Sequence, residues 1–376
     1  MSAAEVGGVA HEGIVGEVVA AEMTAAGLAP NGETAAGTAS AGMIGIAVTT
    51  GALGALDVPA TVRGATSHRG IVYAEVRGFR PLLMDVHVPF GATGPVPCVM
   101  WVHGGGWEVG DRRFTPPNWP VDLLFGSLVD AGLAVATVDY RLSGEARYPA
   151  PLHDLKAAVR FLRTHAEVLG IDAARLGVSG ESAGGHLAAM IALTGDVPRL
   201  EGTVALGNVG VGAAGEGHVG VPGVPGVPGV PGDAGGGPSS AVQAAAILYG
   251  VTDFTAQVAS LGLPPGEIPD APEARFLGAT PEQAPSVATA ASPVTHATSS
   301  APPMLLISGD RDSVVPLDQS ERLRDALLRA GATDVVLEVI AGADHCFDGV
   351  DPAPALATVV TFLATRLHTA QIPKAP

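Results

Sequence analysis

One short turn carries a residue that could act as a nucleophile. Ser182 lies at the centre of Gly180-Glu181-Ser182-Ala183-Gly184, between the apolar run RLGVS and the helical pattern AGGHLAAMIAL. A serine hydroxyl stays protonated at neutral pH, so it attacks a carbonyl carbon only when a base takes its proton. A glycine on each side permits a sharp strand-to-helix turn that lifts the serine above a sheet. The pattern predicts a nucleophile; the alternative is a small residue in a tight turn.

A second stretch could bind the negative charge that develops on a carbonyl oxygen under attack. Gly104, Gly105 and Gly106 follow the apolar run VPCVMWV, and no side chain covers their N–H groups. We expect Gly104 and Gly105, together with the N–H of Ala183, to form an oxyanion hole. A phosphate-binding loop is the alternative, but no lysine follows the glycines as a P-loop requires.

Apolar runs and helical patterns alternate around these residues. Strands are expected at 71–76 and 82–88, and then in the runs VPCVMWVHG, LAVATVDYR, RLGVS, AVQAAAILYG, PPMLLISG and DVVLEVIAG. Runs without polar alternation are typical of strands buried on both faces. Helices are expected in PLHDLKAAVRFLRTHAEVLG, in AGGHLAAMIAL and over 317–330. This order predicts an α/β fold with a mostly parallel eight-stranded sheet and helices on both faces, with any site at the carboxyl ends of the strands.

The motifs HGGGW and GESAGG together resemble those of the α/β-hydrolase esterases. More narrowly, the chain is similar to the hormone-sensitive-lipase-like group and to the feruloyl and acetyl-xylan esterase-like (BD-FAE) group. Similarity to the second group extends through LLMDVHVP, YPAPLHDLKAAVRFLR, AVQAAAILYGVTDF and SPVTHATSSAPPMLLISGDRDSVVP, and so covers about residues 72–367. The resemblance implies the α/β-hydrolase fold and a serine carboxylic-ester hydrolase that works through an acyl-enzyme without a cofactor.

The resemblance also implies an acid and then a histidine after the serine. The stretch ISGDRDSVVP offers Asp310 and Asp312, and Asp312 matches the acid of the family by its position before VVP. Asp310 is then expected to be a loop residue. In VIAGADHCFDG, His345 would take the proton of Ser182, and Asp312 would hold the imidazole in one tautomer. Asp344 is not expected to orient His345, because neighbouring side chains diverge.

Four residues near these motifs have weaker signals. Glu181 matches a position that is often acidic in the family and close to the site, so we expect it near the substrate or supporting the loop by a hydrogen bond. Trp107 is expected to line the site and bind substrate, with plain packing as the alternative. We expect His103 to orient its loop rather than act as a base, and His186 to be packed inside the protein.

The composition limits the kinds of partner. The 376 residues contain 20 Lys and Arg against 37 Asp and Glu, for a net charge of −17, and basic residues do not cluster. This argues against binding nucleic acid or an anionic membrane surface. Cys98 and Cys346 form neither a metal-binding spacing nor a disulfide framework. We expect a small-molecule ester as partner, no metal, and by default a cytoplasmic location; a homodimer is left open.

Two low-complexity segments flank or interrupt the predicted catalytic domain at 58–376. Residues 1–57 are predicted to be a leader or partial cap, with a short helix at 15–26 as one option. Residues 34–56 carry no charge and are long enough to cross a bilayer, but they are mostly Ala, Gly, Thr and Ser and are not expected to insert. The Val-Pro-Gly-rich insertion at about 207–240, with its repeat in residues 219–240, is predicted to be a disordered loop, because proline removes N–H donors and glycine adds backbone entropy.

Three other functions compete with hydrolysis of short-chain acyl or aryl esters. An arylformamidase would cleave an N-formyl aromatic amide, and such enzymes also carry an HGG…W loop. A ligand-binding protein of the same fold would lack the histidine, so the presence of Ser182, Asp312 and His345 together argues against it. A structural role of the Val-Pro-Gly segment would depend on residues 219–240 alone.

Overall fold

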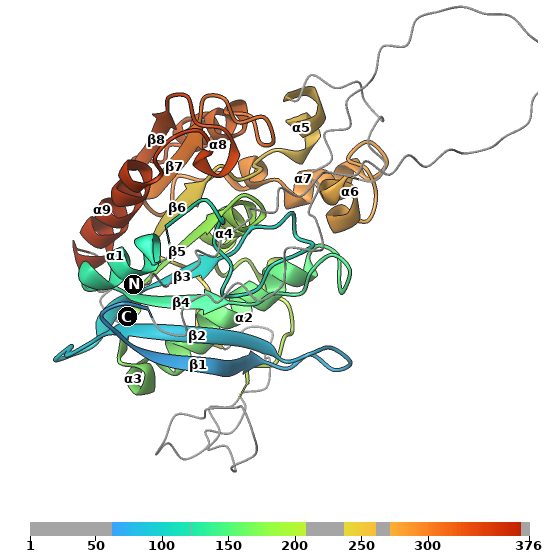
Figure 1. The fold of residues 1–376 in the computed structure, drawn as a ribbon. Coiled ribbons are helices and arrows are strands. Elements are labelled where there is room, and N and C mark those ends of the chain that lie inside the picture. Colours follow the sequence, from blue (N-terminus) through green and yellow to red (C-terminus); the bar gives the residue numbers. More distant parts are fainter. Residues whose placement is uncertain (1–61, 121, 208–236, 261–270, 370–376) are drawn as a thin grey trace, which may run out of the picture. The chain divides into compact units, whose positions relative to one another are not determined.

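The described strands form one eight-stranded sheet in the order β1-β2-β4-β3-β5-β6-β7-β8 (Figure 1). The computed structural model describes residues 62–120, 122–207, 237–260 and 271–369. Only the pairs β1–β2 and β2–β4 are antiparallel, so β2 alone runs opposite to the other described strands, and the predicted mostly parallel sheet is confirmed. The strands are β1 (Ala65–Ala74), β2 (Leu82–Pro89), β3 (Val96–Val102), β4 (Ala134–Val138), β5 (Ile171–Glu181), β6 (Ala244–Leu248), β7 (Met304–Gly309) and β8 (Val335–Ile340).

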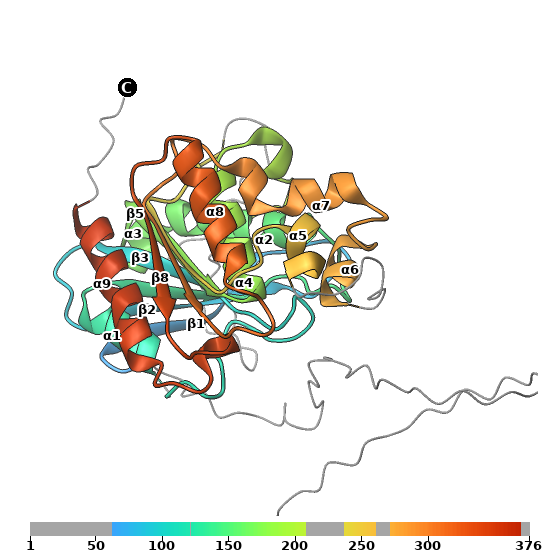
Figure 2. The ribbon, with the colours of Figure 1, turned by 90° about the horizontal axis from the view of Figure 1, so that it is seen from above.

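Helices cover both faces of the sheet, as predicted. On one face lie α1 (Leu123–Asp130) and α9 (Ala353–Thr369); on the other lie α2 (Ala150–Thr164), α4 (Ala183–Thr194) and α8 (Asp318–Arg329) (Figure 2). The shorter helices are α3 (Ala166–Leu169), α5 (Phe254–Ser260), α6 (Pro272–Leu277) and α7 (Pro285–Ala291).

The central strand β3 shows how the sheet separates two cores. Cys98, Met100 and Val102 belong to the core on the α4 side, whereas Val99 and Trp101 belong to the core on the α9 side. Successive side chains of a strand point to opposite faces, so a strand covered on both faces must be apolar throughout. This explains why the runs in the sequence are continuous rather than alternating.

One strand and several helices differ from the prediction. Strand β1 starts at Ala65 instead of residue 71, because its polar first half pairs with β2 at the edge of the sheet, where polar side chains reach solvent. Helices α1, α5, α6 and α7 were not predicted from the sequence, and neither was the long helix α9. Its buried residues Leu356, Val359, Leu363 and Leu367 recur at three- and four-residue intervals, which is the signal that could have found it.

Several expectations fall outside the described residues. These are the leader at 1–57 with its short helix and its uncharged stretch, and residues 208–236 of the Val-Pro-Gly insertion. Within the part of the chain that the structure describes, no helix is both long and apolar enough to cross a membrane.

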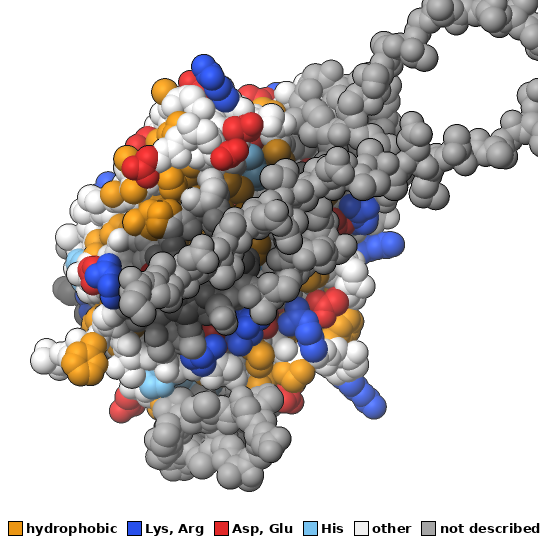
Figure 3. Space-filling model, viewed as in Figure 1, with side chains coloured by type: hydrophobic (Ala, Val, Ile, Leu, Met, Phe, Trp, Pro, Cys, Tyr) orange, Lys and Arg blue, Asp and Glu red, His pale blue; other side chains and the backbone are white. Residues whose placement is uncertain are grey.

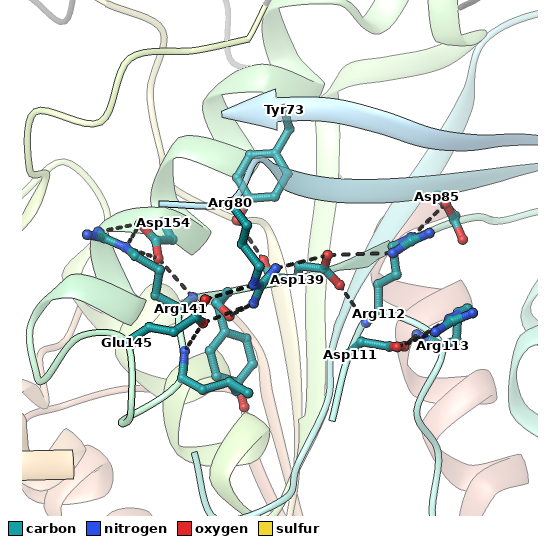
Figure 4. A network of polar contacts seen from close by, with 12 residues as sticks. Tyr73, Arg80, Asp85, Asp111, Arg112, Arg113, Asp139, Arg141, Glu145 and Asp154 are labelled. Carbon is teal, nitrogen blue, oxygen red and sulfur yellow. Dashed lines mark hydrogen bonds and ion pairs between the residues drawn. The ribbon is translucent and has the colours of Figure 1, made fainter. Parts of the chain in front are cut away.

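A network of ion pairs ties the loop after β3 to the neighbouring strands (Figure 4). The buried carboxylate of Asp139 accepts the Arg112 N–H at 2.9 Å and lies 3.4 Å from the Arg80 guanidinium. The Arg112 side chain donates to Asp85 of β2 at 2.9 Å. Basic and acidic side chains also lie beside each other on the surface that Figure 3 shows, as such ion pairs require. The loop that carries the three glycines is thereby anchored to β2 and to the end of β4.

A second ion pair, between Arg141 and Asp154, joins the end of β4 to α2. The Asp154 side chain is wholly buried, and it accepts bonds from the Arg141 backbone N–H at 3.0 Å and from its guanidinium at 2.6 and 2.8 Å. Among the described residues, every bond to this carboxylate comes from Arg141, and the pair fixes α2 against the sheet.

Replacing Asp154 by alanine should strongly destabilise the fold, because the Arg141 guanidinium would stay buried without a counter-charge. The expected loss in the free energy of unfolding is about 3–5 kcal/mol, measured by urea denaturation. As a control, Asp130→Ala breaks the exposed pair with Arg63 and should cost less than about 1 kcal/mol. Equal losses in the two variants would contradict this account.

Candidate active site

Ser182 lies in a strained turn between β5 and α4. Its backbone has φ 52° and ψ −121°, a conformation that residues other than glycine rarely adopt. A Cβ atom on Gly180 would collide with Gly184 O, and one on Gly184 would collide with Val102 O at the end of β3. Both flanking positions therefore require glycine, because the turn packs directly against the neighbouring strand. The structure thus has the strand-to-helix turn that the sequence predicts.

The structure brings Ser182, His345 and Asp312 into one chain of hydrogen bonds. His345 Nε2 lies 3.0 Å from Ser182 Oγ, and His345 Nδ1 lies 2.9 and 3.1 Å from the two oxygens of Asp312. A carboxylate only accepts, so the proton sits on Nδ1 and Nε2 is left to accept the serine hydroxyl. This is the geometry in which a histidine can act as a general base toward a serine.

Asp312 is held in place by its own loop. Its side chain is fully covered, and Oδ1 also accepts the backbone N–H groups of Val314 at 3.0 Å and Val315 at 2.7 Å. These bonds fix the carboxylate before His345 meets it. The three residues predicted at the ends of β5, β7 and β8 therefore meet at the carboxyl edge of the sheet.

The loop after β3 contacts the residue before Ser182 and carries backbone donors without an acceptor in the described part of the chain. Among the described residues, no acceptor bonds the N–H groups of Gly105, Gly106 or Ala183. Gly105 has φ 96°, and a Cβ there would collide with Val109 O, so this position requires glycine. The N–H groups of the predicted donors Gly105 and Ala183, and that of Gly106, are thus unused within the described residues, as an oxyanion hole requires.

The prediction for Gly104 is wrong. Its N–H donates to Glu181 Oε1 at 2.7 Å inside the protein, so this donor is not available to a substrate. The sequence showed three consecutive glycines but could not show which N–H is used internally. Glu181 itself is 1% exposed and lies behind the loop. Of the two roles predicted for Glu181, the structure therefore favours support of the loop over contact with substrate.

Burial changes the acidity of Glu181. Loss of solvation raises its pKa from the ordinary 4.5 to about 7, although charge on His345 and the bond from Gly104 act in the opposite direction. The contact that holds the oxyanion loop is therefore made by a group that titrates near neutral pH.

Trp107 packs inside the protein instead of binding substrate. The side chain is 2% exposed, stacks on Phe276 with ring centroids 4.7 Å apart, and donates from Nε1 to His186 Nδ1 at 3.2 Å. His186 is packed as predicted, and burial lowers its pKa to about 4. His103 orients its loop as expected, because its Nδ1 bonds Gly104 O at 2.8 Å.

Two residues that sequence reasoning missed support the turn after His345. Trp119 Nε1 and Asn118 Nδ2 donate to Cys346 O at 3.0 and 3.1 Å, and the Trp119 ring stacks on Phe347. Cys346 and Phe347 both have φ 60°, so the turn is strained and needs external support.

Among the residues that the structure describes, no group of three His, Cys, Asp or Glu side chains could hold a metal ion.

The family of this chain follows from its similarity to known proteins. The BD-FAE family model matches residues 84–211 and 233–327, which is more than half of the chain. The chain belongs to the BD-FAE family. The matched segments include Ser182 and Asp312 and end before His345, so the histidine of this BD-FAE protein is assigned by the geometry above.

Relatives and solved structures agree with this membership. The chain is 27% identical to "Esterase LipC" and 30% identical to "Esterase LipQ" of Mycobacterium tuberculosis, over 69% and 72% of its length. The matches span 55% of each relative, so the chain corresponds to about half the length of these curated proteins. A "Truncated form of carbohydrate esterase from gut microbiota" superposes with a TM-score of 0.64 at 26% identity, over 83% of this chain and 99% of that one.

A more distant structure supports the fold alone. Esterase Est2 of Thermogutta terrifontis superposes with a TM-score of 0.56 at 22% identity, over 84% of this chain and 96% of that one. With the carbohydrate esterase, it confirms the α/β-hydrolase fold that the motifs imply.

The pKa of Glu181 gives a test of its burial. The folded protein holds this proton more tightly than the unfolded chain, so the resulting stability is present below pH 4.5 and is lost as the pH rises through about 7. Glu181→Gln cannot ionise and keeps an acceptor oxygen for Gly104. Relative to wild type, the variant should therefore gain about 2 kcal/mol in free energy of unfolding between about pH 5 and pH 8. Urea unfolding at several pH values measures this; a constant difference would contradict the assignment.

Proposed function

We propose that this chain is a serine carboxylic-ester hydrolase that acts on short-chain acyl or aryl esters through an acyl-enzyme. The observation that carries the proposal is the continuous hydrogen-bond chain Asp312–His345–Ser182 beside unbonded N–H groups in the described loop. A nucleophile, its base, the group that orients the base and an oxyanion hole are the parts that acyl transfer requires.

The geometry supports a sequence of proton movements. Ser182 Oγ would attack the ester carbonyl carbon while His345 Nε2 takes the hydroxyl proton. The carbonyl oxygen, now negative, would be bound by the N–H groups of Gly105, Gly106 and Ala183. His345 would then give its proton to the leaving alcohol, so that the acyl group stays on Ser182.

Hydrolysis of the acyl-enzyme would use the same residues, with water in place of the serine hydroxyl. His345 would take a proton from a water molecule, and the resulting hydroxide would attack the acyl carbon under the same oxyanion hole. Collapse of this intermediate would release the carboxylic acid as His345 returns the proton to Ser182 Oγ. Throughout, Asp312 would hold Nδ1–H and stabilise the positive imidazolium, and no cofactor enters either half.

The names of the relatives support an ester as substrate. LipC and LipQ are described as esterases, and the 26%-identical solved structure is described as a carbohydrate esterase. An arylformamidase would use the same attack on a formyl carbon and is the alternative reaction at this site. A pure binding role is disfavoured because the serine–histidine–aspartate chain is complete.

The remaining expectations are part of the same proposal. The partner is a small-molecule ester, with no nucleic acid or membrane surface involved, and a homodimer stays a prediction. The cytoplasmic location also stays a prediction; the unpaired state of both cysteines is compatible with a reducing compartment.

Hydrolysis of p-nitrophenyl acetate, butyrate and octanoate tests the proposal. Purified protein should turn over the shorter esters, and Ser182→Ala should lower kcat/KM by about ten-thousandfold, because the acyl-enzyme cannot form. Equal activity of the two proteins would contradict the assignment of Ser182. Turnover of N-formyl aromatic amides that depends on Ser182, without ester turnover, would favour the arylformamidase reaction instead.

A further inference from the structure

The loops that carry Asp312 and His345 are bonded to each other along their length. We call residues 310–313 the acid loop and residues 341–345 the histidine loop; they leave the sheet at the ends of β7 and β8, where Gly309 pairs with Ile340. Beyond this last pair, the Asp310 N–H donates to Ile340 O at 3.2 Å and the Arg311 N–H donates to Ala343 O at 3.0 Å. The pairing of the two strands therefore continues into the site.

Two carboxylates extend this pairing where backbone carbonyls no longer face the donors. Asp310 Oδ1 of the acid loop accepts the Gly342 N–H at 2.6 Å. In the other direction, Asp344 Oδ1 of the histidine loop accepts the Ser313 N–H at 2.8 Å and the Ser313 hydroxyl at 2.9 Å. The bonds are reciprocal, because each loop supplies one carboxylate to the backbone of the other.

Asp344 also bonds to the backbone of the histidine itself. The same Oδ1 accepts the His345 N–H at 2.7 Å, so one oxygen joins the residue after Asp312 to the backbone of His345. Bonds to an ionised acceptor are stronger than bonds between neutral groups. Partial burial alone would raise the pKa of Asp344, but the bonds from Ser313 and His345 outweigh it and leave the pKa below its ordinary value. Asp344 is thus an anion when it holds the two loops.

The turn after His345 explains why such a link is needed. Cys346 and Phe347 both have φ 60°, a conformation that costs energy in residues with a Cβ atom. Trp119 and Asn118 hold this turn through bonds to Cys346 O. Asp344 bonds both the start of the strained turn and the acid loop.

We propose that Asp344, together with Asp310, is a positioning residue for the hydrolytic reaction: the two carboxylates hold the histidine loop against the acid loop, so that His345 stays between Asp312 and Ser182. Neither carboxylate touches substrate or the reacting atoms in this account. The inference rests on the proposed function, because positioning matters only if His345 acts on Ser182.

The test compares Asp344→Ala, Asp344→Asn and Asp348→Ala in the full chain. Asp348 is exposed, lies in the same turn and makes no side-chain bond among the described residues, so its substitution removes a like charge without touching the link. Three quantities are measured: kcat and KM for p-nitrophenyl acetate, the melting temperature, and the downfield Nδ1 proton resonance of His345 by NMR. The resonance reports the bond to Asp312 without any substrate.

Asp344→Ala should lower kcat by about ten- to a hundredfold with KM within about twofold, because a base displaced by a fraction of an ångström is a poor base. Its Nδ1 proton resonance should broaden or disappear. Asp344→Asn should lie between wild type and Asp344→Ala, because an amide oxygen still accepts the bonds without the charge. Asp348→Ala should match wild type in all three measurements.

A folded Asp344→Ala protein with wild-type kcat and a wild-type resonance would overturn the proposal. If that variant does not fold, Asp310→Ala tests the same link from the acid loop, with the same expected loss of kcat and the same contrary outcome. The proposed function fails separately, if wild-type turnover is absent or survives Ser182→Ala. In that case the resonance alone decides whether the carboxylates position His345.

Discussion

The strained turn at Ser182 is the constraint on which the rest of the site depends. A serine at φ 52° is unfavourable by about 1–3 kcal/mol, and the surrounding packing must offset this cost. Helix α4 is buried along its whole length, and the Ser182 N–H donates to Leu248 O of β6 at 3.0 Å. Because β3 leaves no room for a side chain at Gly180 or Gly184, the turn has no alternative path. The hydroxyl is therefore presented at the carboxyl edge of the sheet.

The loops that meet at this edge are organised by carboxylates with different tasks. Glu181 accepts the Gly104 N–H, whereas the N–H groups of the next two glycines have no acceptor among the described residues. Asp312 faces the histidine ring, whereas Asp310 and Asp344 bond backbone donors of the opposite loop. In each case an acceptor satisfies donors that regular secondary structure no longer satisfies at the strand ends. The bonds that satisfy the loop N–H groups thus also fix the residues of the site.

The sequence was sufficient for the parts of the site that depend on position along the chain. Ser182, Asp312 and His345 each follow a strand of the parallel part of the sheet, and parallel strands bring their carboxyl ends to one edge. It was not sufficient where the direction of a side chain decides. Trp107 could have lined the site or packed below it, and only its fit against Phe276 settles the matter.

The predictions for Gly104 and Asp344 also failed because the sequence does not show where a carboxylate side chain points. The use of the Gly104 N–H depends on where the Glu181 carboxylate lies, which no spacing reveals. Asp344 was set aside because the side chains of neighbouring residues diverge. That argument holds for the imidazole of His345, but the carboxylate bonds the backbone N–H of His345 instead. Helix α9, by contrast, had a visible apolar period and could have been predicted.

The central claim is that His345 activates Ser182 for attack on an electrophilic centre. Intact-mass measurement after incubation with a fluorophosphonate tests this claim most directly, because the reagent needs no knowledge of the natural substrate. The account predicts one adduct, located on Ser182 by peptide mapping, that forms rapidly in wild type and is nearly absent in His345→Ala. An adduct elsewhere in the chain, or labelling of Ser182 at the same rate in both proteins, would contradict it.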